Sequence, residues 1–406
     1  MTLIDPVIFP PSNSPVASVV VLAWKMEETL LACLESVAMS ENAPLFEMIV
    51  VLNGASTAAR DLVASRVSGA VIVDLPSNVG FGSGCNAGAG VARGEFIIFL
   101  NDDTVVDPSW LERLVSAARD LPSASAIASL LRNTDGTLQE AGSRVLADGT
   151  AQLGRGMSLE EAASQGLLSR REIDYGSAAA LLVRATAFRA VAAFDQAFEP
   201  AYYEDVDLQF RLRLAGGDII FEPSAQVKHV SGASTSASGR YREWASWHGS
   251  RVFQDRWADV LAHAPEPDAP LSVLAPVREW GDASAITNGR TLPTADEITA
   301  GAPSTALSLA QRYAAWLEAR LDAMAATLEH HQRHIERREF ELEHLTTEVE
   351  TKIAEVETLR DELRTVTSRA DELNHRLHDL DNRGVIGIAK WRAGLVAARR
   401  RARKSR

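Results

Sequence analysis

Short apolar runs alternate with stretches of helical spacing over the first hundred residues. Residues 18–23 (SVVVLA) and 47–52 (EMIVVL) are β-branched runs of strand length, and the segment between them repeats its apolar positions at helical spacing. The alternation recurs between residues 70–75 (AVIVDL) and 95–100 (EFIIFL), where a glycine-rich turn leads into a helical segment. This pattern predicts an α/β domain with a parallel, doubly wound sheet.

Polar residues follow the carboxyl ends of these predicted strands. Asn53 comes after the second strand, Asn78 after the third and Asp103 after the fourth. Ligands of open parallel sheets collect at this edge, where loops and helix N-termini converge. We therefore expect the three side chains to lie close to one binding site.

The pattern changes after residue 264 and divides the chain. An N-terminal arm (1–15) precedes the predicted α/β domain (16–264), and residues 265–304, rich in Pro, Ala, Gly and Thr, are predicted to be a linker. Residues 305–382 are predicted to form a long helix, and residues 383–406 form a basic, amphipathic tail.

The long helical segment carries an apolar seam with alternating 4-3 spacing, and neither Gly nor Pro interrupts it. Such a 3.5-residue repeat predicts a left-handed coiled coil. We expect a parallel homodimer rather than a hairpin, because no turn breaks the seam; a single solvated helix is the alternative. The seam comprises Leu317, Leu321, Met324, Leu328, Ile335, Leu342, Leu345, Val349, Val356, Leu359, Leu363, Val366, Leu373, Leu377 and Leu380, and His331, Arg338, Lys352 and Ala370 fill its remaining positions.

The tail combines cations with apolar side chains. It contains many Lys and Arg residues and no acid, alongside Ile386, Ile388, Trp391 and Leu395. This composition is typical of an interfacial segment that binds an anionic membrane surface. A tail that only keeps the helix in solution is the alternative.

Composition and charge exclude several classes of protein. The 406 residues carry a net charge of -13, whereas nucleic-acid binding requires a basic surface, so nucleic acid is not an expected partner. No signal-peptide pattern opens the chain, and no stretch reaches the roughly 20 apolar residues of a spanning helix. Cys33 and Cys85 lie far apart and imply no disulfide framework. We expect a cytoplasmic protein, peripheral at the inner face of the plasma membrane.

The first group with candidate chemistry spans residues 78–104. Its glycines let backbone amides approach a ligand, and its strand ends in Asn101, Asp102 and Asp103. Adjacent oxygen ligands suit Mg²⁺ or Mn²⁺, and such an ion stabilises a diphosphate leaving group as a Lewis acid. The alternative is structural, with Asp102 and Asp103 capping the helix that begins near Pro108.

Three carboxylates, Glu204, Asp205 and Asp207, crowd the start of a predicted amphipathic helix. A transfer onto a hydroxyl needs one base within reach of the attacking oxygen, and Asp205 is the candidate. Alternatively the acids face solvent and pair with Arg211 or Arg213 at helical spacing, which we favour for Asp207.

His229 follows a further predicted strand and precedes a loop rich in serine and glycine. Neutral imidazole is a common metal ligand, so His229 is a candidate ligand for the same ion. The loop after it is a candidate lid. A purely structural histidine is the alternative.

The order of these motifs resembles glycosyltransferase family 2, especially its bacterial rhamnosyltransferase-like members, over residues 16–262. The first strand and helix match as SVVVLAWKMEETLLACLES, and LNGAS matches an Asp-Asn-Gly-Ser type turn in which Leu52 replaces the acid. That acid contacts the nucleotide in many members, so the nucleotide stays open. The other matches are Asn78, Gly80 and Phe81 (Asn-x-Gly-Phe), Asn86 and Gly88, Asn101 to Asp103 (Asp-x-Asp), Ala193 to Gln196 (Gly-Phe-Asp-Glu), Tyr202 to Leu208 (Tyr-x-Glu-Asp-x-Asp-Leu), and Pro223, Ala225 and His229 (Pro-x-Ala-x-x-x-His).

The resemblance implies a GT-A fold, with a mostly parallel sheet flanked by helices, and a reaction. The reaction is inverting, metal-dependent transfer of a sugar from a nucleotide-diphosphate donor to a hydroxyl of a glycan or lipid-linked acceptor in cell-surface polysaccharide synthesis. Asp205 is then the general base, and Asp103, with Asn101 and His229, binds Mg²⁺ or Mn²⁺. The resemblance gives the donor side as Ala23, Trp24, Asn53, Gly54, Asn78, Gly80, Phe81, Asn86 and Asp102, and the acceptor side as Tyr203, Glu204 and Trp244.

Two other functions compete with this interpretation. Gly82, Gly84 and Ala87, with Asp102 about 20 residues on, form a loose dinucleotide fingerprint typical of an NAD-binding oxidoreductase. That class is weaker, because LPSNVGF separates the fingerprint from its strand and nothing in it explains YYEDVDL. The third function is an inactive, glycosyltransferase-like scaffold assembled by its coiled coil.

Overall fold

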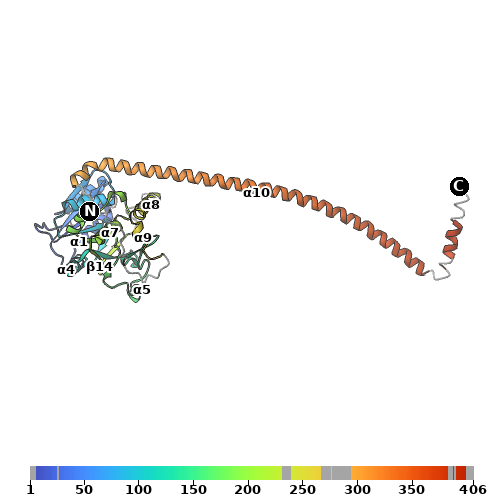
Figure 1. Cartoon of the computed structure of the whole chain (residues 1–406), viewed down its shortest axis with the longest axis horizontal. Helices are drawn as coiled ribbons and strands as arrows, with labels where there is room; N and C mark the ends of the chain where they lie inside the picture. The colour runs from blue at the N-terminus through green and yellow to red at the C-terminus, as the bar shows by residue number, and fades with distance from the viewer. Residues whose placement is uncertain are drawn as a thin grey trace, which may run out of the picture. The chain divides into compact units, whose positions relative to one another are not determined.

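The computed structural model of the chain describes residues 6–24, 27–230, 239–266, 276, 294–382, 387 and 390–398. It divides into two compact units, Met1–Leu317 and Glu318–Arg406. The first unit holds all the strands of the described residues, and its helices gather around one sheet (Figure 1).

Ten strands of the described residues form the main sheet, in the order β12-β14-β8-β13-β6-β2-β3-β5, with β7 on β14 and β9 on β8. Their bounds are β2 (Ala17–Ala23), β3 (Phe46–Asn53), β5 (Val71–Leu75), β6 (Phe96–Asn101), β7 (Thr104–Val106), β8 (Ala124–Arg132), β9 (Leu138–Glu140), β12 (Arg171–Glu172), β13 (Ala180–Arg184) and β14 (Asp218–His229). Two small sheets accompany it: β1 (Val7–Ile8) with β4 (Val67–Ser68), and β10 (Ser143–Leu146) with β11 (Gly149–Gln152).

The parallel pattern holds for one half of the sheet only. The four predicted strands appear as β2, β3, β5 and β6, and all of their pairings with one another are parallel. In the other half, β13 lies antiparallel between β6 and β8, and β12, β7 and β9 also pair antiparallel. The sheet is therefore mixed rather than mostly parallel. Antiparallel neighbours need no crossover helix, which explains why the chain reaches β13 from β8 through short strands and one short helix.

The helices of the first unit cover both faces of the sheet. Successive residues of β2 divide the two cores: Val19 and Val21 pack with α1, α2 and α4, whereas Val20 packs with α3, α6 and α7. The helices are α1 (Glu27–Ala38), α2 (Thr57–Arg66), α3 (Phe81–Val91), α4 (Trp110–Asp120), α5 (Leu159–Ser164), α6 (Ala185–Ala190), the 3₁₀ turn η1 (Gln196–Phe198), α7 (Glu204–Leu214), α8 (Gly239–Arg256) and α9 (Ala258–Leu261).

Glycines on helix α3 let its backbone approach the side chains of the sheet closely. A Cβ at Gly88 would lie 2.5 Å from Val20 Cγ1 and 2.8 Å from Val51 Cγ2, and one at Gly84 would lie 2.5 Å from Leu22 Cδ1. The glycines of this segment therefore set the distance between helix and sheet, and with it the position of the helix N-terminus at the strand ends.

The last helix, α10 (Ala295–Asn382), begins inside the predicted linker 265–304. Thr294 and Glu297 form reciprocal hydrogen bonds at its start, Thr294 N to Glu297 Oε2 (2.7 Å) and Glu297 N to Thr294 Oγ1 (3.2 Å). Such a capping pair starts helices. Ile298 and Ala302 then bury against the sheet's helices, so the helix continues through Pro303. Residues 267–275 and 277–293 of the predicted linker lie outside the described residues.

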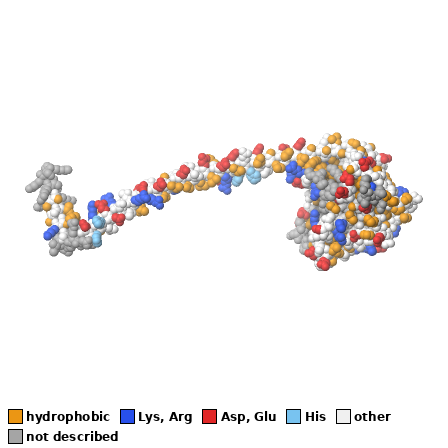
Figure 2. All heavy atoms as spheres, turned by 180° about the vertical axis from the view of Figure 1, so that it is seen from behind, with side chains coloured by type: hydrophobic (Ala, Val, Ile, Leu, Met, Phe, Trp, Pro, Cys, Tyr) orange, Lys and Arg blue, Asp and Glu red, His pale blue; other side chains and the backbone are white. Residues whose placement is uncertain are grey.

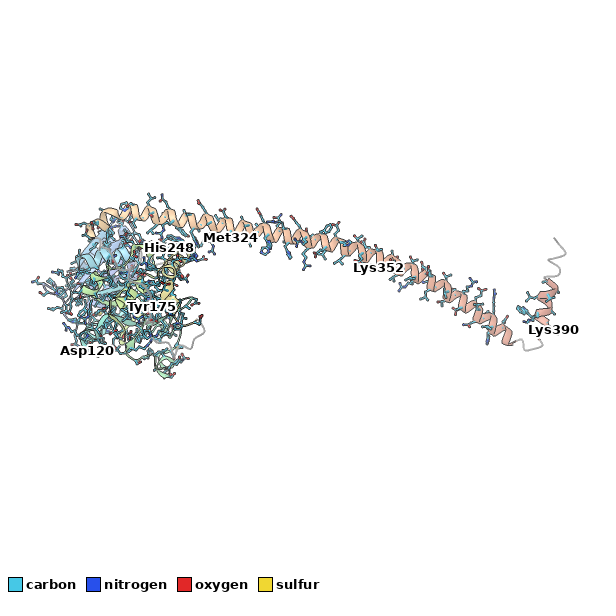
Figure 3. The ribbon with its side chains drawn as sticks, viewed as in Figure 1. Asp120, Tyr175, His248, Met324, Lys352 and Lys390 are labelled. Atoms are coloured by element: carbon cyan, nitrogen blue, oxygen red, sulfur yellow. The ribbon has the colours of Figure 1, made fainter. Side chains whose placement is uncertain are left out.

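In the second unit, α10 continues as one helix whose apolar seam faces solvent. Leu321, Met324, Leu328 and their successors up to Leu377 are 54–68% exposed. Orange side chains line this part of the helix between charged ones (Figure 2), and Met324 and Lys352 project from it (Figure 3). The partner that the seam predicts stays a prediction.

The predicted tail is described only in part, at residues 387 and 390–398. Residues 390–398 are helical, and Trp391 and Leu395 are each 43% exposed. Ile386 and Ile388 lie outside the described residues. None of the helices described for the chain combines the length and the apolar composition that crossing a membrane requires.

Candidate active site

One cleft of about 610 Å³ lies at the carboxyl ends of β2, β3 and β6. As predicted, Asn53, Asn78 and Asp103 line it together. Its other lining residues of predicted function are Trp24, Gly80, Phe81, Asn101, Asp102, Tyr203, Glu204, Asp205 and His229. The residues that the resemblance gave to the donor, the metal and the acceptor therefore largely share one cavity.

The end of β6 delivers the predicted metal ligands. Asp102 and Asp103 are 3% and 2% exposed, and Asp102 Oδ2 accepts a hydrogen bond from Trp24 N (3.2 Å). β7 pairs with the last residues of β14, which brings His229 Nε2 to 3.0 Å from Asp103 Oδ1. Asn101 Nδ2 lies 3.4 Å from the same imidazole nitrogen.

The orientation of His229 suits a metal ligand. Its Nδ1 lies 2.9 Å from Gln139 Oε1, so an Nδ1 proton donated to that carbonyl leaves the Nε2 lone pair facing the Asp103 carboxylate. Histidine ligands are commonly fixed in this way, by a hydrogen bond from the other ring nitrogen. Two hydrogen-bond acceptors at 3.0 Å need a cation or a proton between them.

The described residues hold no group of three His, Cys, Asp or Glu side chains that would enclose an ion. An open set of Asp103, His229 and the Asn101 amide instead fits an ion that completes its shell with phosphate oxygens and water, as Mg²⁺ usually does. These three side chains are thus compatible with a divalent cation that is also bound by the phosphates of the substrate.

Two asparagines shape the donor side of the cleft. Asn53 Oδ1 accepts a hydrogen bond from Val79 N (2.9 Å), and Asn53 Nδ2 donates to Gly80 O (3.0 Å) and to Asn78 Oδ1 (3.2 Å). Gly80 has a φ of 94°, and a Cβ there would collide with the Glu199 carboxylate. These contacts fix the turn from which α3 starts at the cleft.

Four predicted site residues do not line the cleft. Ala23 is buried at the end of β2, and Gly54 makes the tight turn after β3, where its N–H donates to Leu75 O (3.1 Å). Asn86 is fully buried and bonds Phe194 twice, through Nδ2 to the carbonyl (2.9 Å) and through Oδ1 from the N–H (3.1 Å). These three residues lie outside the lining of the cleft, and their contact with the donor stays a prediction.

Trp244, predicted on the acceptor side, is 2% exposed and packs behind Tyr241 at a ring-centroid distance of 5.3 Å. Three residues of α8 line the cleft: Tyr241, Arg242 and Ser246. Trp244 therefore supports the wall of the cleft rather than forming it.

The acceptor-side carboxylates stand at the start of α7. Asp205 Oδ2 accepts a hydrogen bond from Ala178 N (3.1 Å), and its Oδ1 accepts from Val206 N (2.9 Å). Burial raises the pKa of Asp205, whereas these backbone hydrogen bonds oppose the shift. Burial, followed by the charge of Asp205, raises the pKa of Glu204 well above its usual range.

Asp207 has a structural position, with one correction. Its carboxylate bonds Arg211 Nε (2.8 Å) as predicted, and also Arg256 (2.8 Å) and Trp257 Nε1 (3.0 Å). It is fully buried, so the expectation that it faces solvent was wrong. Both sides of α7 are buried, which contradicts the predicted amphipathic helix.

Sequence reasoning missed several side chains of the cleft: Gln139, Glu140, Arg155, Tyr175, Ser177, Tyr241 and Arg242. Glu140 is buried beside Asp205, and burial raises its pKa to about 7. Tyr175 (Figure 3) lies on the segment that leads to β13. Tyr241 and Arg242 come from the start of α8, and the others come from β9 and from loops, so no repeating pattern in the sequence pointed to them.

The loop predicted as a lid, residues 231–238, lies outside the described residues. Both cysteines are free and buried, in agreement with the expectation of no disulfide. Burial raises the pKa of the Cys33 thiol to about 12.

Comparison with known proteins bears on this site. Residues 18–174 match the model of a protein family described as glycosyl transferase family 2. These residues belong to glycosyl transferase family 2. Together with the mixed sheet flanked by helices and the long last helix, this membership confirms the predicted GT-A glycosyltransferase fold.

Several curated relatives are similar to the chain at 28% identity. The N-acetylglucosaminyl-diphospho-decaprenol L-rhamnosyltransferase of Mycobacterium tuberculosis matches over 247 residues, 54% of this chain and 78% of the relative. The uncharacterized protein y4gI of Sinorhizobium fredii and the O-antigen biosynthesis protein RfbC of Myxococcus xanthus each match over 56% of this chain. The matches span only 26% and 18% of those two relatives.

Among solved structures, the crystal structure of GalNAc-T7 with UDP, GalNAc and Mn2+ is similar at a TM-score of 0.47 and 15% identity. The similarity covers 68% of this chain and 53% of that chain.

The glycines of the loose dinucleotide fingerprint have another role in the family 2 domain. A Cβ at Gly82 would lie 3.0 Å from Phe194 Cβ, and Gly84 faces Leu22 of the sheet. Close packing of α3 therefore explains these glycines without a dinucleotide.

Proposed function

We propose that the chain is an inverting, metal-dependent glycosyltransferase, which moves a sugar from a nucleotide-diphosphate donor to an acceptor hydroxyl. The observation that carries the proposal is that Asp103, next to His229, and Asp205 line the same cleft. Membership of residues 18–174 in a glycosyltransferase family supports it.

Asp103, with Asn101 and His229, would hold Mg²⁺ or Mn²⁺ on the donor side. Bound there, the ion supplies Lewis-acid stabilisation of the negative charge that develops on the diphosphate leaving group. The Asp102 carboxylate accepts a hydrogen bond from the backbone N–H of Trp24 and so fixes Trp24 on the donor side, next to the proposed metal ligands. Asn53, Asn78, Gly80 and Phe81 form the rest of that side.

Asp205 acts as general base. It takes the proton of the acceptor hydroxyl as the oxygen bonds to the anomeric carbon, and the carbon–oxygen bond to the diphosphate breaks with its electron pair on the leaving group. Attack from the opposite face inverts the configuration. Asp205 suits this role better than Glu204, since two backbone N–H groups stabilise its ionised form. Tyr203 and Glu204 line the acceptor side.

The acceptor we propose is a glycan or lipid-linked sugar of cell-surface polysaccharide synthesis, and the donor sugar is a rhamnosyl or hexosyl group. The names of the relatives support this class: one transfers rhamnose to a diphospho-decaprenol-linked sugar, and another acts in O-antigen biosynthesis.

We further propose that two copies associate through the apolar seam of α10 and that the basic tail binds an anionic membrane, at the inner face of the plasma membrane. The exposed seam from Leu321 to Leu377 supports the first part. Two tails on one assembly raise the effective concentration of the enzyme at the surface. Such an arrangement suits a lipid-linked acceptor.

A donor screen tests the function. Purified protein with Mn²⁺ or Mg²⁺ is incubated with a panel of nucleotide-diphosphate sugars, and release of nucleoside diphosphate is measured with and without EDTA. Metal-dependent release from one donor supports the proposal and excludes an inactive scaffold. No release from any donor, together with nicotinamide-dinucleotide binding in a fluorescence titration, supports the oxidoreductase alternative.

A further inference from the structure

We propose that Arg312, in the part of α10 that belongs to the first unit, is a positioning residue for the acceptor side of the cleft. Through residues 199–203 it holds Glu204 and Asp205 in place. This inference rests on the proposed function for its kinetic consequence, and on the contacts of α10 for its structural one.

Arg312 contacts the loop before α7 directly and also contacts a histidine of α8 that lies beside the loop. Its Nη2 donates a hydrogen bond to Glu199 O (3.2 Å), and the same nitrogen contacts His248 Nε2 on α8. His248 Nε2 also lies 3.0 Å from Ala197 O, in the turn η1 that enters the loop. His248 lies beside the first part of α10 in Figure 3. Arg312 therefore joins α10, α8 and the loop.

Glu199 and the residue after it link the loop to the donor side of the cleft. Its side chain is buried and accepts a hydrogen bond from Ser83 N (2.7 Å) in the first turn of α3. The next carbonyl, Pro200 O, accepts from Phe81 N (2.8 Å). The loop thus bridges α3, which lines the donor side, and α7, which carries Asp205.

The loop ends in two strained residues. Tyr202 and Tyr203 have φ values of 76° and 70°, in the left-handed region that non-glycine residues rarely adopt. Such residues persist only where the surrounding structure holds them. They stand directly before Glu204 and Asp205, so their conformation decides where both carboxylates lie.

α8 and α10 supply the surrounding structure. Tyr202, Tyr241 and Tyr313 pack against a buried cluster that contains Trp244, and the Tyr241 and Tyr313 rings meet at a centroid distance of 5.2 Å. A Cβ at Gly249 would lie 2.3 Å from Tyr202 O, so α8 approaches the loop backbone directly. Tyr202, Tyr203 and Tyr241 all line the cleft, which makes this packing part of its wall.

Removal of Arg312 leaves Glu199 O and the His248 side of the loop without their fixed partner, while the metal side of the cleft is untouched. The expected signature is selective. Transfer slows because the base and the acceptor hydroxyl are misaligned, and small misplacements of reacting groups cost up to about a hundredfold in rate. Donor binding should change less than kcat, because the proposed metal ligands Asp103 and His229 lie on other elements, at the ends of β6 and β14.

The experiment compares Arg312→Ala and Arg312→Lys with wild type in the full chain. Arg333→Ala is the matched control, because Arg333 lies on the same helix with a side chain 73% exposed. With Arg312→Ala we expect kcat for transfer to fall roughly ten- to hundredfold while the donor KM stays within about twofold. Lysine keeps the charge without the planar fork and should rescue part of the loss.

Hydrogen exchange of residues 199–208 provides a readout that does not depend on activity. Arg312→Ala should speed exchange there and leave the peptide containing Asp103 unchanged. Gly249→Ala, which displaces Tyr202 O from α8, should give the same kinetic signature if Arg312→Ala does not fold. Wild-type kcat and exchange in Arg312→Ala overturn the inference, as does an equal loss in Arg333→Ala. Faster exchange in a chain without activity on any donor overturns the proposed function alone.

Discussion

Asp207 has a buried carboxylate that pairs with two arginines and accepts a hydrogen bond from one indole. Its partners are Arg211, Arg256 and Trp257, and its side chain is 0% exposed. Removing one member of a buried ion-pair network leaves the others uncompensated, at a cost of about 3–5 kcal/mol. We expect Asp207→Ala to lower the free energy of unfolding in urea by that amount. Asp255→Ala, an exposed acid on α8, is the control, and an equal loss there would contradict the assignment.

Glu199 makes stability depend on pH. Burial raises its pKa from 4.5 to about 8. Between these values the unfolded chain is ionised and the folded chain holds the proton, so the free energy of unfolding falls as pH rises, by up to about 1.4 kcal/mol per pH unit. We expect the free energy of unfolding of Glu199→Gln, measured by chemical denaturation, to rise steadily relative to that of wild type from pH 5 to pH 8. A difference that is constant over this range contradicts the shift.

The residues that the sequence identified share a recognisable signal. Asp103 follows an apolar strand, and Asp205 and His229 lie in motifs of fixed spacing, so their shared cleft was predictable. Gln139 and Arg312 carry no such signal, because each matters only through a partner far away in sequence. Asn86 differs from them: it occupies a motif position, but its side chain hydrogen-bonds Phe194 and does not line the cleft.

At the scale of elements, two effects of a glycine oppose each other in α3. Gly88→Ala gains about 1 kcal/mol of helix propensity, but the new Cβ would lie 2.5 Å from Val20, and overpacking costs about 1–3 kcal/mol. We expect a net loss of stability by thermal unfolding. Gly301→Ala on α10 is the matched control, since its Cβ meets nothing within 4 Å and only the propensity gain applies. Stabilisation by Gly88→Ala would contradict the close packing.

The elements were predictable where a local pattern decides them. β2, β3, β5 and β6 followed from apolar runs, whereas the antiparallel insertion of β13 depends on pairing between distant segments. The start of α10 was missed although Thr294 and Glu297 carry the capping signal, because proline and alanine around them indicated a linker.

At the scale of the whole molecule, the seam of α10 predicts a second copy. We expect sedimentation to give about twice the 43.9 kDa of one chain. Leu359→Asp places a charge in the seam and should give the mass of a single copy. Thr358→Asp changes the exposed neighbouring residue, which lies outside the seam, and should leave the mass of two copies unchanged. An unchanged mass for Leu359→Asp would remove the seam from the interface.

The charges beside the seam favour a parallel pair. In a parallel, in-register coiled coil Glu355 faces Arg360 of the second copy, whereas an antiparallel pair centred on Glu348 places Glu341 against Glu355. Glu355→Arg should therefore weaken association, and adding Arg360→Glu should restore it. Failure of the second change to restore association would argue against the parallel arrangement.

In the proposed function, Asp103 serves the donor and Asp205 the acceptor within one cleft. Titration calorimetry with nucleoside diphosphate and Mn²⁺, alongside turnover of the best donor, separates the two roles in Asp103→Asn and Asp205→Asn. We expect Asp205→Asn to bind nucleotide as wild type does and to lose about 10²–10⁴ in kcat, and Asp103→Asn to lose metal-dependent binding itself. Turnover near wild type in Asp205→Asn, or unchanged metal-dependent binding in Asp103→Asn, would contradict it.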